Sequence, residues 1–216
     1  QSSILSLVEE IEKKKYEFIY LEDIRKILSI KDKLFAIKDF FLNIFTSKKL
    51  NKNQLAVILY TSGTESDPKG VGLTHENLFF NRIQILKSLK IDRNEKFFTC
   101  LPFFHSFGLG IGVLLPILHG CKVFLYPTPL HFQTIPKLIE EKKSTVFFST
   151  DTFLKKYIPH VEKHTFENLK YLIAGAEKVD QSTHTKYLEF GVQILEGYGV
   201  TEASPAISVN TKDNYK

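Results

Sequence analysis

Hydrophobic residues after position 50 fall in short continuous runs that alternate with longer amphipathic stretches. Six runs predict β-strands, at residues 55–60, 96–101, 122–126, 145–149, 171–174 and 192–195. The stretches between them predict helices, at residues 75–89, 109–118, 134–142, 152–158 and 182–189. Thr74 suits the N-cap of the first helix, because its hydroxyl can accept a free backbone N–H. This alternation is typical of an α/β fold, in which a mostly parallel sheet carries helices on both faces.

The first fifty residues follow a different pattern. Apolar residues at positions 4, 7, 8 and 11 predict a short helix, and residues 16–21 predict a strand. Residues 24–45 predict a longer helix with Lys and Asp on its polar side, and the polar residues 48–53 predict a linker. We therefore expect an upstream segment at 1–50 and the α/β part at 51–216.

Composition narrows the class of protein. The chain has 216 residues, of which 43% are hydrophobic and 25% charged, as expected for a folded globular chain. Its net charge of +5 comes from lysines spread in short runs along the sequence. Such scattered lysines are typical of a solvated surface, so we expect no nucleic-acid partner. The first residue is Gln1, and we expect the chain to be part of a larger parent.

Residues 101–121 contain no acidic side chain, lysine or arginine and approach the length of a membrane-spanning helix. They include two prolines and two histidines, which are costly inside a bilayer, so we expect a buried core helix instead. Cys100 and Cys121 lie among apolar residues and are expected to be free thiols. With no signal peptide in the sequence, these features predict a cytoplasmic protein.

The first polar motif directly follows the predicted strand 55–60, where ligands of parallel sheets bind. It contains three hydroxyl residues, a glycine and, five positions later, a lysine: Thr61, Ser62, Gly63, Thr64 and Lys69. Backbone N–H groups and hydroxyls of such a loop can surround phosphate oxygens, and the lysine adds a positive charge. An ordinary polar turn is the alternative, but the sequence Pro68-Lys69-Gly70 favours a loop that aims its lysine at a phosphate.

The second motif is Leu-Pro-Phe-Phe-His-Ser-Phe-Gly at residues 101–108. Its His105 follows a strand end and a proline, where it can orient a carboxylate or gate an apolar tunnel. A core histidine is the alternative for this residue. The apolar residues around it suit either an acyl pocket or a plain core helix.

Two further motifs follow the predicted strands 171–174 and 192–195. In the first, Gly175, Ala176 and Glu177 allow a flat ring to approach the backbone. The second is Glu-Gly-Tyr-Gly-Val-Thr-Glu at residues 196–202, and its Tyr198, beside Gly199, can present a ring face to a base. Thr201 can donate to a phosphate, and Glu202 can bind Mg²⁺. A turn with a surface glutamate is the alternative.

In this order, the four motifs resemble the adenylate-forming, or AMP-binding, superfamily of acyl-CoA synthetases, peptide-synthetase adenylation domains and luciferases. The resemblance covers residues 55–210. Within the superfamily, the motifs are most similar to the bifunctional bacterial acyl-[acyl carrier protein] synthetase/2-acylglycerophosphoethanolamine acyltransferases, as is Tyr-Leu-Glu-Asp-Ile-Arg at residues 20–25. On this resemblance residues 51–216 form a truncated AMP-binding subdomain.

The resemblance implies a role for each motif. The loop of Thr61, Ser62, Gly63, Thr64 and Lys69 would hold the β- and γ-phosphates of ATP. His105 would lie beside the acyl pocket and the reacting carboxylate. Gly175, Ala176 and Glu177 would wall the adenine, with Tyr198 and Gly199 on its ring face. Thr201 would contact the α-phosphate, and Glu202 would hold Mg²⁺.

The implied activity is ATP-dependent activation of a fatty acid and its transfer to acyl carrier protein, serving lysophospholipid reacylation through a separate domain. Membrane association of the parent at the cytoplasmic face of the inner membrane is also implied. The chain departs from the superfamily pattern at Glu65 and Ser66, and it lacks the ribose-binding Asp motif, the C-terminal domain and the acyltransferase His-x-x-x-x-Asp motif. A long-chain acyl-CoA synthetase, or a nucleotide- or partner-binding module without turnover, is therefore the alternative.

Overall fold

The structure is a computed structural model that describes residues 23, 26–44, 51–61, 68–162 and 164–213. It divides into two units, Gln1–Leu50 and Asn51–Lys216, which we describe separately. In the first unit, α3 (Ile30–Ile44) lies within the helix predicted at 24–45. The helix predicted near residues 4–11 and the strand predicted at 16–21 lie outside the described residues.

The second unit begins with a hairpin of β1 (Leu55–Thr61) and β2 (Lys69–Thr74), which pair antiparallel in a two-stranded sheet of their own. The sequence predicted the run 55–60 as a strand of the parallel sheet, and that assignment is wrong. The hydrophobic pattern missed β2, because two of its six residues are glycines that carry no apolar side chain. Thr61 and Lys69 are paired in register at the loop end of this hairpin.

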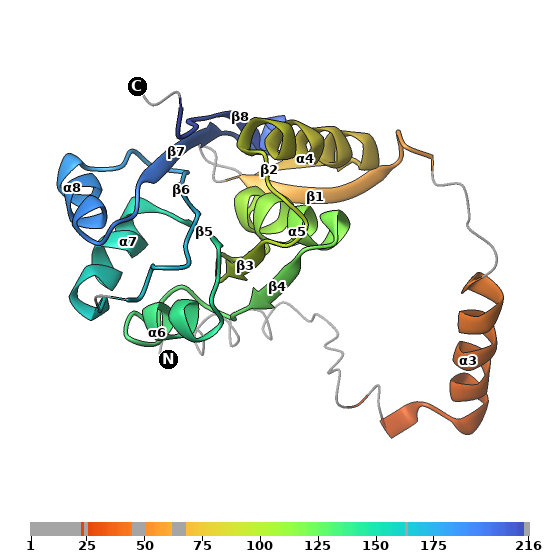
Figure 1. Cartoon of the computed structure of the whole chain (residues 1–216). Coiled ribbons are helices and arrows are strands. Elements are labelled where there is room, and N and C mark those ends of the chain that lie inside the picture. Colours follow the sequence, from red (N-terminus) through yellow and green to blue (C-terminus); the bar gives the residue numbers. More distant parts are fainter. Residues whose placement is uncertain (1–22, 24–25, 45–50, 62–67, 163, 214–216) are drawn as a thin grey trace, which may run out of the picture. The chain divides into compact units, whose positions relative to one another are not determined.

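A six-stranded sheet forms the centre of the second unit, in the order β4-β3-β5-β6-β7-β8 (Figure 1). Its strands are β3 (Lys96–Thr99), β4 (Lys122–Leu125), β5 (Val146–Ser149), β6 (Tyr171–Ala174), β7 (Ile194–Gly199) and β8 (Ala206–Val209). The first five strands are parallel, and only β8 runs antiparallel to its neighbour. The predicted α/β fold is thereby confirmed, although β8 was not predicted and β7 continues into the Gly-Tyr-Gly motif.

Helices cover both faces of this sheet. Those on one face are α4 (His75–Leu89), the π-helix η1 (Phe107–Leu114) and α5 (Leu115–His119). The other face carries α6 (Thr134–Glu141), α7 (Asp151–Tyr157) with the 3₁₀ turn η2 (Ile158–His160), and α8 (Gln181–Glu189). The neighbouring residues Phe147 and Phe148 belong to the two opposite core clusters. Because strand side chains alternate between faces, a strand buried on both sides is apolar at nearly every position, as β5 is before Ser149.

Helix α4 begins where the sequence predicts it. Thr74 accepts the Asn77 backbone N–H at 3.1 Å, and the Asn77 side chain accepts the Thr74 N–H at 3.0 Å. This reciprocal capping box satisfies two of the amide groups that a helix start leaves free. The predicted N-cap is confirmed, and α4 therefore starts directly at the end of β2.

The apolar stretch 101–121 is not a regular α-helix. It forms the π-helix η1 and then α5, and Ile111 and Leu115 bury their side chains in the core. Thr99 of β3 donates to the Gly112 carbonyl at 2.7 Å, and a Cβ at position 112 would lie 3.0 Å from the Thr99 methyl. A glycine therefore lets η1 approach β3 closely. No helix among the described residues has the length and hydropathy needed to cross a membrane.

The two cysteines are free thiols, as the sequence predicts. Cys100 is buried, and this burial raises the pKa of its thiol to about 12, although the Tyr157 hydroxyl opposes the shift. Cys121 is half-buried rather than buried.

The strands β3 and β5 are neighbours in the sheet, but the chain leaves them toward opposite faces. From β3 the chain crosses to β4 over the face of η1 and α5, whereas the connection from β5 to β6 uses α7 on the other face. The segments that leave the carboxyl ends of β3 and β5 therefore diverge to opposite faces of the sheet. Such a divergence is where ligands bind in sheets of this type.

Candidate functional site

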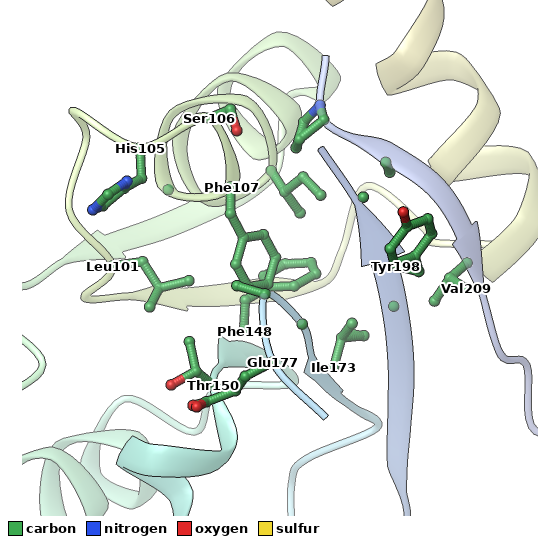
Figure 2. Close-up of a pocket in the computed structure, with 18 of the residues that line it drawn as sticks. Leu101, His105, Ser106, Phe107, Phe148, Thr150, Ile173, Glu177, Tyr198 and Val209 are labelled. Atoms are coloured by element: carbon green, nitrogen blue, oxygen red, sulfur yellow. The ribbon is translucent and has the colours of Figure 1, made fainter. Parts of the chain in front are cut away.

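A pocket of about 570 Å³ lies at the carboxyl ends of β3, β5, β6 and β7 (Figure 2). Seven of the residues predicted from the sequence line it: His105, Gly175, Ala176, Glu177, Tyr198, Gly199 and Thr201. They come from three motifs spread over almost a hundred residues of sequence. Its remaining lining is largely apolar, with Ile85 and Leu89 from α4, and Ile111, Phe148 and Ile173 from the core beneath it. The pocket therefore combines an apolar interior with polar strand ends.

The segment after β6 approaches its neighbours closely. A Cβ at Gly175 would lie 3.2 Å from the Gly197 carbonyl oxygen and 3.5 Å from the Phe107 ring. Ala176 follows with a φ of 69°, in the left-handed region that residues with a Cβ rarely adopt. Gly175 is buried and Ala176 is exposed, and both line the pocket.

Glu177 is fixed by the start of α7. Its carboxylate accepts the Thr152 backbone N–H at 2.6 Å and the Thr152 hydroxyl at 2.8 Å. Partial burial acts to raise the pKa of Glu177, but the hydrogen bonds from Thr150 and Thr152 outweigh it and lower that pKa. Glu177 is thus an ionised clamp that joins the wall after β6 to the helix after β5 (Figure 2).

Tyr198 and Gly199 form the end of β7. The Tyr198 side chain is 63% exposed, and its ring borders the pocket opposite Glu177 (Figure 2). A Cβ at Gly199 would lie 2.2 Å from the Pro205 carbonyl oxygen, which is closer than a real Cβ approaches another atom. Glycine is therefore required at position 199, because the returning chain before β8 packs directly against it.

Thr201 opens the 3₁₀ turn η3 (Thr201–Ala203), which follows β7. Its hydroxyl lies 3.1 Å from the Ser106 hydroxyl, so the turn is joined to the loop after β3. His105 in that loop is exposed at the pocket, and its ring centroid is 4.6 Å from that of Phe104. The structure thus brings the loop with His105 and the turn with Thr201 together at one site.

The phosphate-loop motif lies between β1 and β2. Ser62, Gly63 and Thr64 lie outside the described residues, as do Glu65 and Ser66. Thr61 ends β1, and Lys69, which is exposed, begins β2. Neither residue lines the pocket, but β2 is in contact with η3. The hairpin that carries Lys69 therefore lies beside the turn that carries Thr201 and Glu202.

Glu202 is exposed on η3 and does not line the pocket. Within the described part of the chain, no group of three or more histidine, cysteine, aspartate or glutamate side chains could hold a metal ion. A single exposed carboxylate nevertheless fits Mg²⁺, which in nucleotide sites takes one or two protein carboxylates and completes its coordination with phosphates and water. Glu202 would be that ligand, and the ion would neutralise phosphate charge.

Several residues around the pocket could not be recognised from the sequence. Asn81 of α4 bonds to the segment after η3, and Thr152 holds Glu177. Glu196 lies 3.1 Å from the buried His184 of α8, which fixes β7 from the other face of the sheet. The backbone partners of Asn81 are more than 120 residues away in sequence, and no local pattern indicates such a contact.

Comparison with known proteins identifies the family of this chain. Residues 5–216 match the AMP-binding enzyme family. A long-chain-fatty-acid–CoA ligase from Bacillus subtilis is 30% identical over 165 residues, which cover 74% of this chain and 29% of the ligase. A feruloyl-CoA synthase from Amycolatopsis is 28% identical over 159 residues, covering 73% of this chain and 32% of that enzyme. The chain thus spans about a third of the length of these relatives.

Solved structures show the same relationship. Apo MatB from Rhodopseudomonas palustris superposes with a TM-score of 0.71 at 26% identity, covering 80% of this chain and 34% of MatB. The ATP-bound form of MatB gives the same TM-score of 0.71 and the same 26% identity, over 79% of this chain and 34% of MatB. With a family match over nearly all of its residues and a pocket built from the family-like motifs, the chain belongs to the AMP-binding enzymes.

Proposed function

We propose that this chain forms the nucleotide- and acyl-binding part of an ATP-dependent acid–thiol ligase. The observation that carries the proposal is the convergence of the motifs after β3, β6 and β7 on one pocket with an apolar interior. The relatives are named as CoA ligases and synthases, and they support the same class of reaction.

In the proposed first half-reaction, a carboxylate oxygen of the acid attacks the α-phosphorus of ATP. The bond from that phosphorus to the bridging oxygen breaks, and pyrophosphate leaves. Negative charge grows on the phosphates, so the hydroxyl of Thr201 and the ammonium of Lys69 stabilise the transition state by donating to them. Gly175, Ala176, Glu177 and Tyr198 would hold the adenine, and His105 would orient the attacking carboxylate.

In the second half-reaction, a thiolate attacks the acyl carbonyl and AMP leaves with the electrons of the broken acyl–oxygen bond. The acceptor thiol is that of a phosphopantetheine arm, on CoA or on acyl carrier protein. The names of the relatives favour CoA. The likeness of the motifs to the bifunctional bacterial branch favours acyl carrier protein and, through a separate domain, lysophospholipid reacylation.

A fatty acid is the substrate that best fits the interior of the pocket. Ile85, Leu89 and Ile111 line it from one face of the sheet, and Phe148 and Ile173 from the strands. An alkyl chain gains about 0.8 kcal/mol for each CH₂ group that such a surface removes from water. Long- and medium-chain fatty-acid–CoA ligases are among the relatives, as is a feruloyl-CoA synthase with an aromatic acid in its name.

The test is pyrophosphate release from Mg·ATP by the full-length protein, measured with hexadecanoate, octanoate and ferulate, with CoA or acyl carrier protein as acceptor. We expect release with a fatty acid and thioester formation with one acceptor. Absence of release with all three acids overturns the proposal. In that case calorimetric binding of Mg·ATP without turnover would support the alternative, a nucleotide-binding module.

A further inference from the structure

The side chain of Asn81 is buried in α4, where its polar groups face another segment of the chain. Its Nδ2 donates to the carbonyl oxygens of Ala206 at 2.7 Å and Ala203 at 3.2 Å. Its Oδ1 accepts the Ala206 backbone N–H at 3.2 Å. Only 5% of the residue is exposed, so these bonds replace its contacts with water.

The bonded segment closes the turn η3. Ala203 is the last residue of η3, and Ala206 is the first of β8. Between them Ser204 adopts a φ of 74° and is followed by Pro205, whose carbonyl accepts the Val200 N–H at 2.9 Å. Asn81 therefore holds both ends of the return from η3 to β8. A three-residue 3₁₀ turn has weak hydrogen bonds of its own and depends on such external contacts.

The same side chain connects the two phosphate-facing parts of the proposed site. Helix α4 starts directly after β2, whose first residue is Lys69, and β2 is in contact with η3. Thr201 and Glu202 lie on η3. Through Asn81, the helix that continues the Lys69 hairpin is bonded to the turn that presents Thr201 and Glu202.

Packing alone does not explain an asparagine at this position. An apolar side chain would attach α4 to the sheet without the cost of burying an amide. Apart from a long contact of 3.5 Å from Nδ2 to Gln84 Oε1, the amide of Asn81 bonds to Ala203 and Ala206, so it orients the segment that these two residues bound.

We propose that Asn81 is a positioning residue for catalysis, which sets Thr201 and Glu202 against the phosphates and Mg²⁺ of the bound nucleotide. This inference rests on the proposed function. A buried amide that contacts no substrate would then determine how Thr201 and Glu202 are placed against the phosphates.

The test compares Asn81→Asp with wild type in the full-length protein. Aspartate keeps the shape and the acceptor for the Ala206 N–H but loses the donors to both carbonyls. We expect kcat/KM for Mg·ATP to fall roughly 10- to 100-fold, the range seen when residues behind a metal site are changed. The KM for the fatty acid should stay at its wild-type value, since the apolar pocket is untouched. Asn81→Ala, which leaves room for water, should show the same split if the aspartate variant does not fold.

Arg82→Ala is the matched control. Arg82 lies on the same helical turn, but its guanidinium donates to the Leu118 carbonyl at 3.4 Å and so attaches α4 to α5 instead. This variant should keep the wild-type KM for Mg·ATP. Hydrogen exchange gives a second measurement, in which Asn81→Ala, which removes the acceptor for the Ala206 N–H, should speed exchange of that amide while Arg82→Ala should not.

The outcomes separate the inference from the proposed function. If wild type is active and Asn81→Asp keeps its constants for Mg·ATP, the inference is wrong and the proposed function stands. A similar loss in Arg82→Ala, or an equal rise in the KM for the fatty acid, would also overturn it, because either result indicates general damage to α4. An inactive wild type overturns the proposed function itself.

Discussion

The hydroxyl groups of Ser106 and Thr201 lie 3.1 Å apart, although 95 positions separate them in the sequence. Ser106 precedes η1 on the segment that carries His105, and Thr201 begins η3 after β7. One residue therefore stands on the acyl side of the proposed site and the other on its phosphate side. Their contact joins the two segments that, in the proposed mechanism, hold the two reactants in line.

Replacing Ser106 by alanine should weaken this alignment. A hydrogen bond between neutral hydroxyls contributes about 1 kcal/mol to stability, so we expect the melting temperature to fall by about 2 to 4 °C. If the alignment loses the same free energy in the transition state, kcat for pyrophosphate release should fall about fivefold. The control is Thr128→Ala, which removes a hydroxyl that accepts the Leu130 N–H outside the pocket. If Ser106→Ala is as active as wild type, the contact has no part in catalysis.

The two glycines that flank Tyr198 should differ in their tolerance of alanine. At Gly199 a Cβ would lie 2.2 Å from the Pro205 oxygen, whereas at Gly197 the nearest atom would be at 3.7 Å, an ordinary contact. We expect Gly199→Ala to lower the free energy of unfolding by about 1 to 3 kcal/mol, as overpacking does. Gly197→Ala should change it by less. Urea denaturation of both variants measures the difference, and equal stabilities would contradict the close approach of Pro205.

The Glu177 clamp should make stability depend on pH. Burial opposes the shift, but the hydrogen bonds from Thr150 and Thr152 hold the pKa of Glu177 below its ordinary 4.5. A lowered folded-state pKa stabilises the fold above about pH 4.5, and this contribution is lost as the pH falls through the lowered pKa. Glu177→Gln should therefore be less stable than wild type at pH 7, and the difference should shrink on acidification below pH 4.5.

Thr152→Val provides the partner test, since it removes one donor and keeps the carboxylate. Its loss of stability on acidification should begin at the same pH as in wild type, near the unfolded-state pKa, but should be smaller and end at a higher pH, because the pKa of Glu177 in the folded state is lowered less. Thermal unfolding measured from pH 7 to pH 3 follows both variants. A constant difference between wild type and Glu177→Gln over this range would show that the carboxylate charge does not contribute.

The sequence predicted the central sheet well because its strands are buried on both faces. β6 was predicted with its observed bounds, and β3, β4 and β5 within one or two residues of theirs. A strand such as β5 has an apolar side chain at nearly every position, and this signal does not depend on distant parts of the chain. Helix α4 was predicted equally well, because both its cap and its periodicity are local.

The strands that were missed or misassigned lack such a signal. Two of the four residues of β8 are exposed, and two of the six residues of β2 are glycines, so neither strand shows a clear run of apolar side chains. Periodicity also does not distinguish an antiparallel hairpin from a strand of a parallel sheet, which is why β1 was assigned to the wrong sheet. The π-helical form of η1 and its hydrogen bond from Thr99 are likewise not revealed by the sequence alone.

The motifs of the site were identifiable because each is a short group of polar residues and glycines that directly follows an apolar strand. Their supports were not identifiable. Asn81, Thr152 and His184 lie on helices and look like ordinary polar residues in the sequence. Only their contacts across the fold show that they hold the segments bearing Thr201, Glu177 and Tyr198.

Lys69 and Glu202 allow the proposed phosphate chemistry to be tested without damage to the fold. Both side chains are exposed, and neither belongs to the core clusters, so Lys69→Ala and Glu202→Ala should unfold at the wild-type temperature. Each should nevertheless slow pyrophosphate release roughly 100-fold or more, because each removes a charge that acts on the phosphates in the transition state. Since Glu202 would act through Mg²⁺, its variant should need a higher Mg²⁺ concentration for half-maximal rate, whereas Lys69→Ala should not.

Lys178→Ala, which removes an exposed lysine that does not line the pocket, is the control for a change in net charge. Wild-type rates in either variant would remove that residue from the site, and an unchanged Mg²⁺ requirement in Glu202→Ala would show that its carboxylate does not hold the ion.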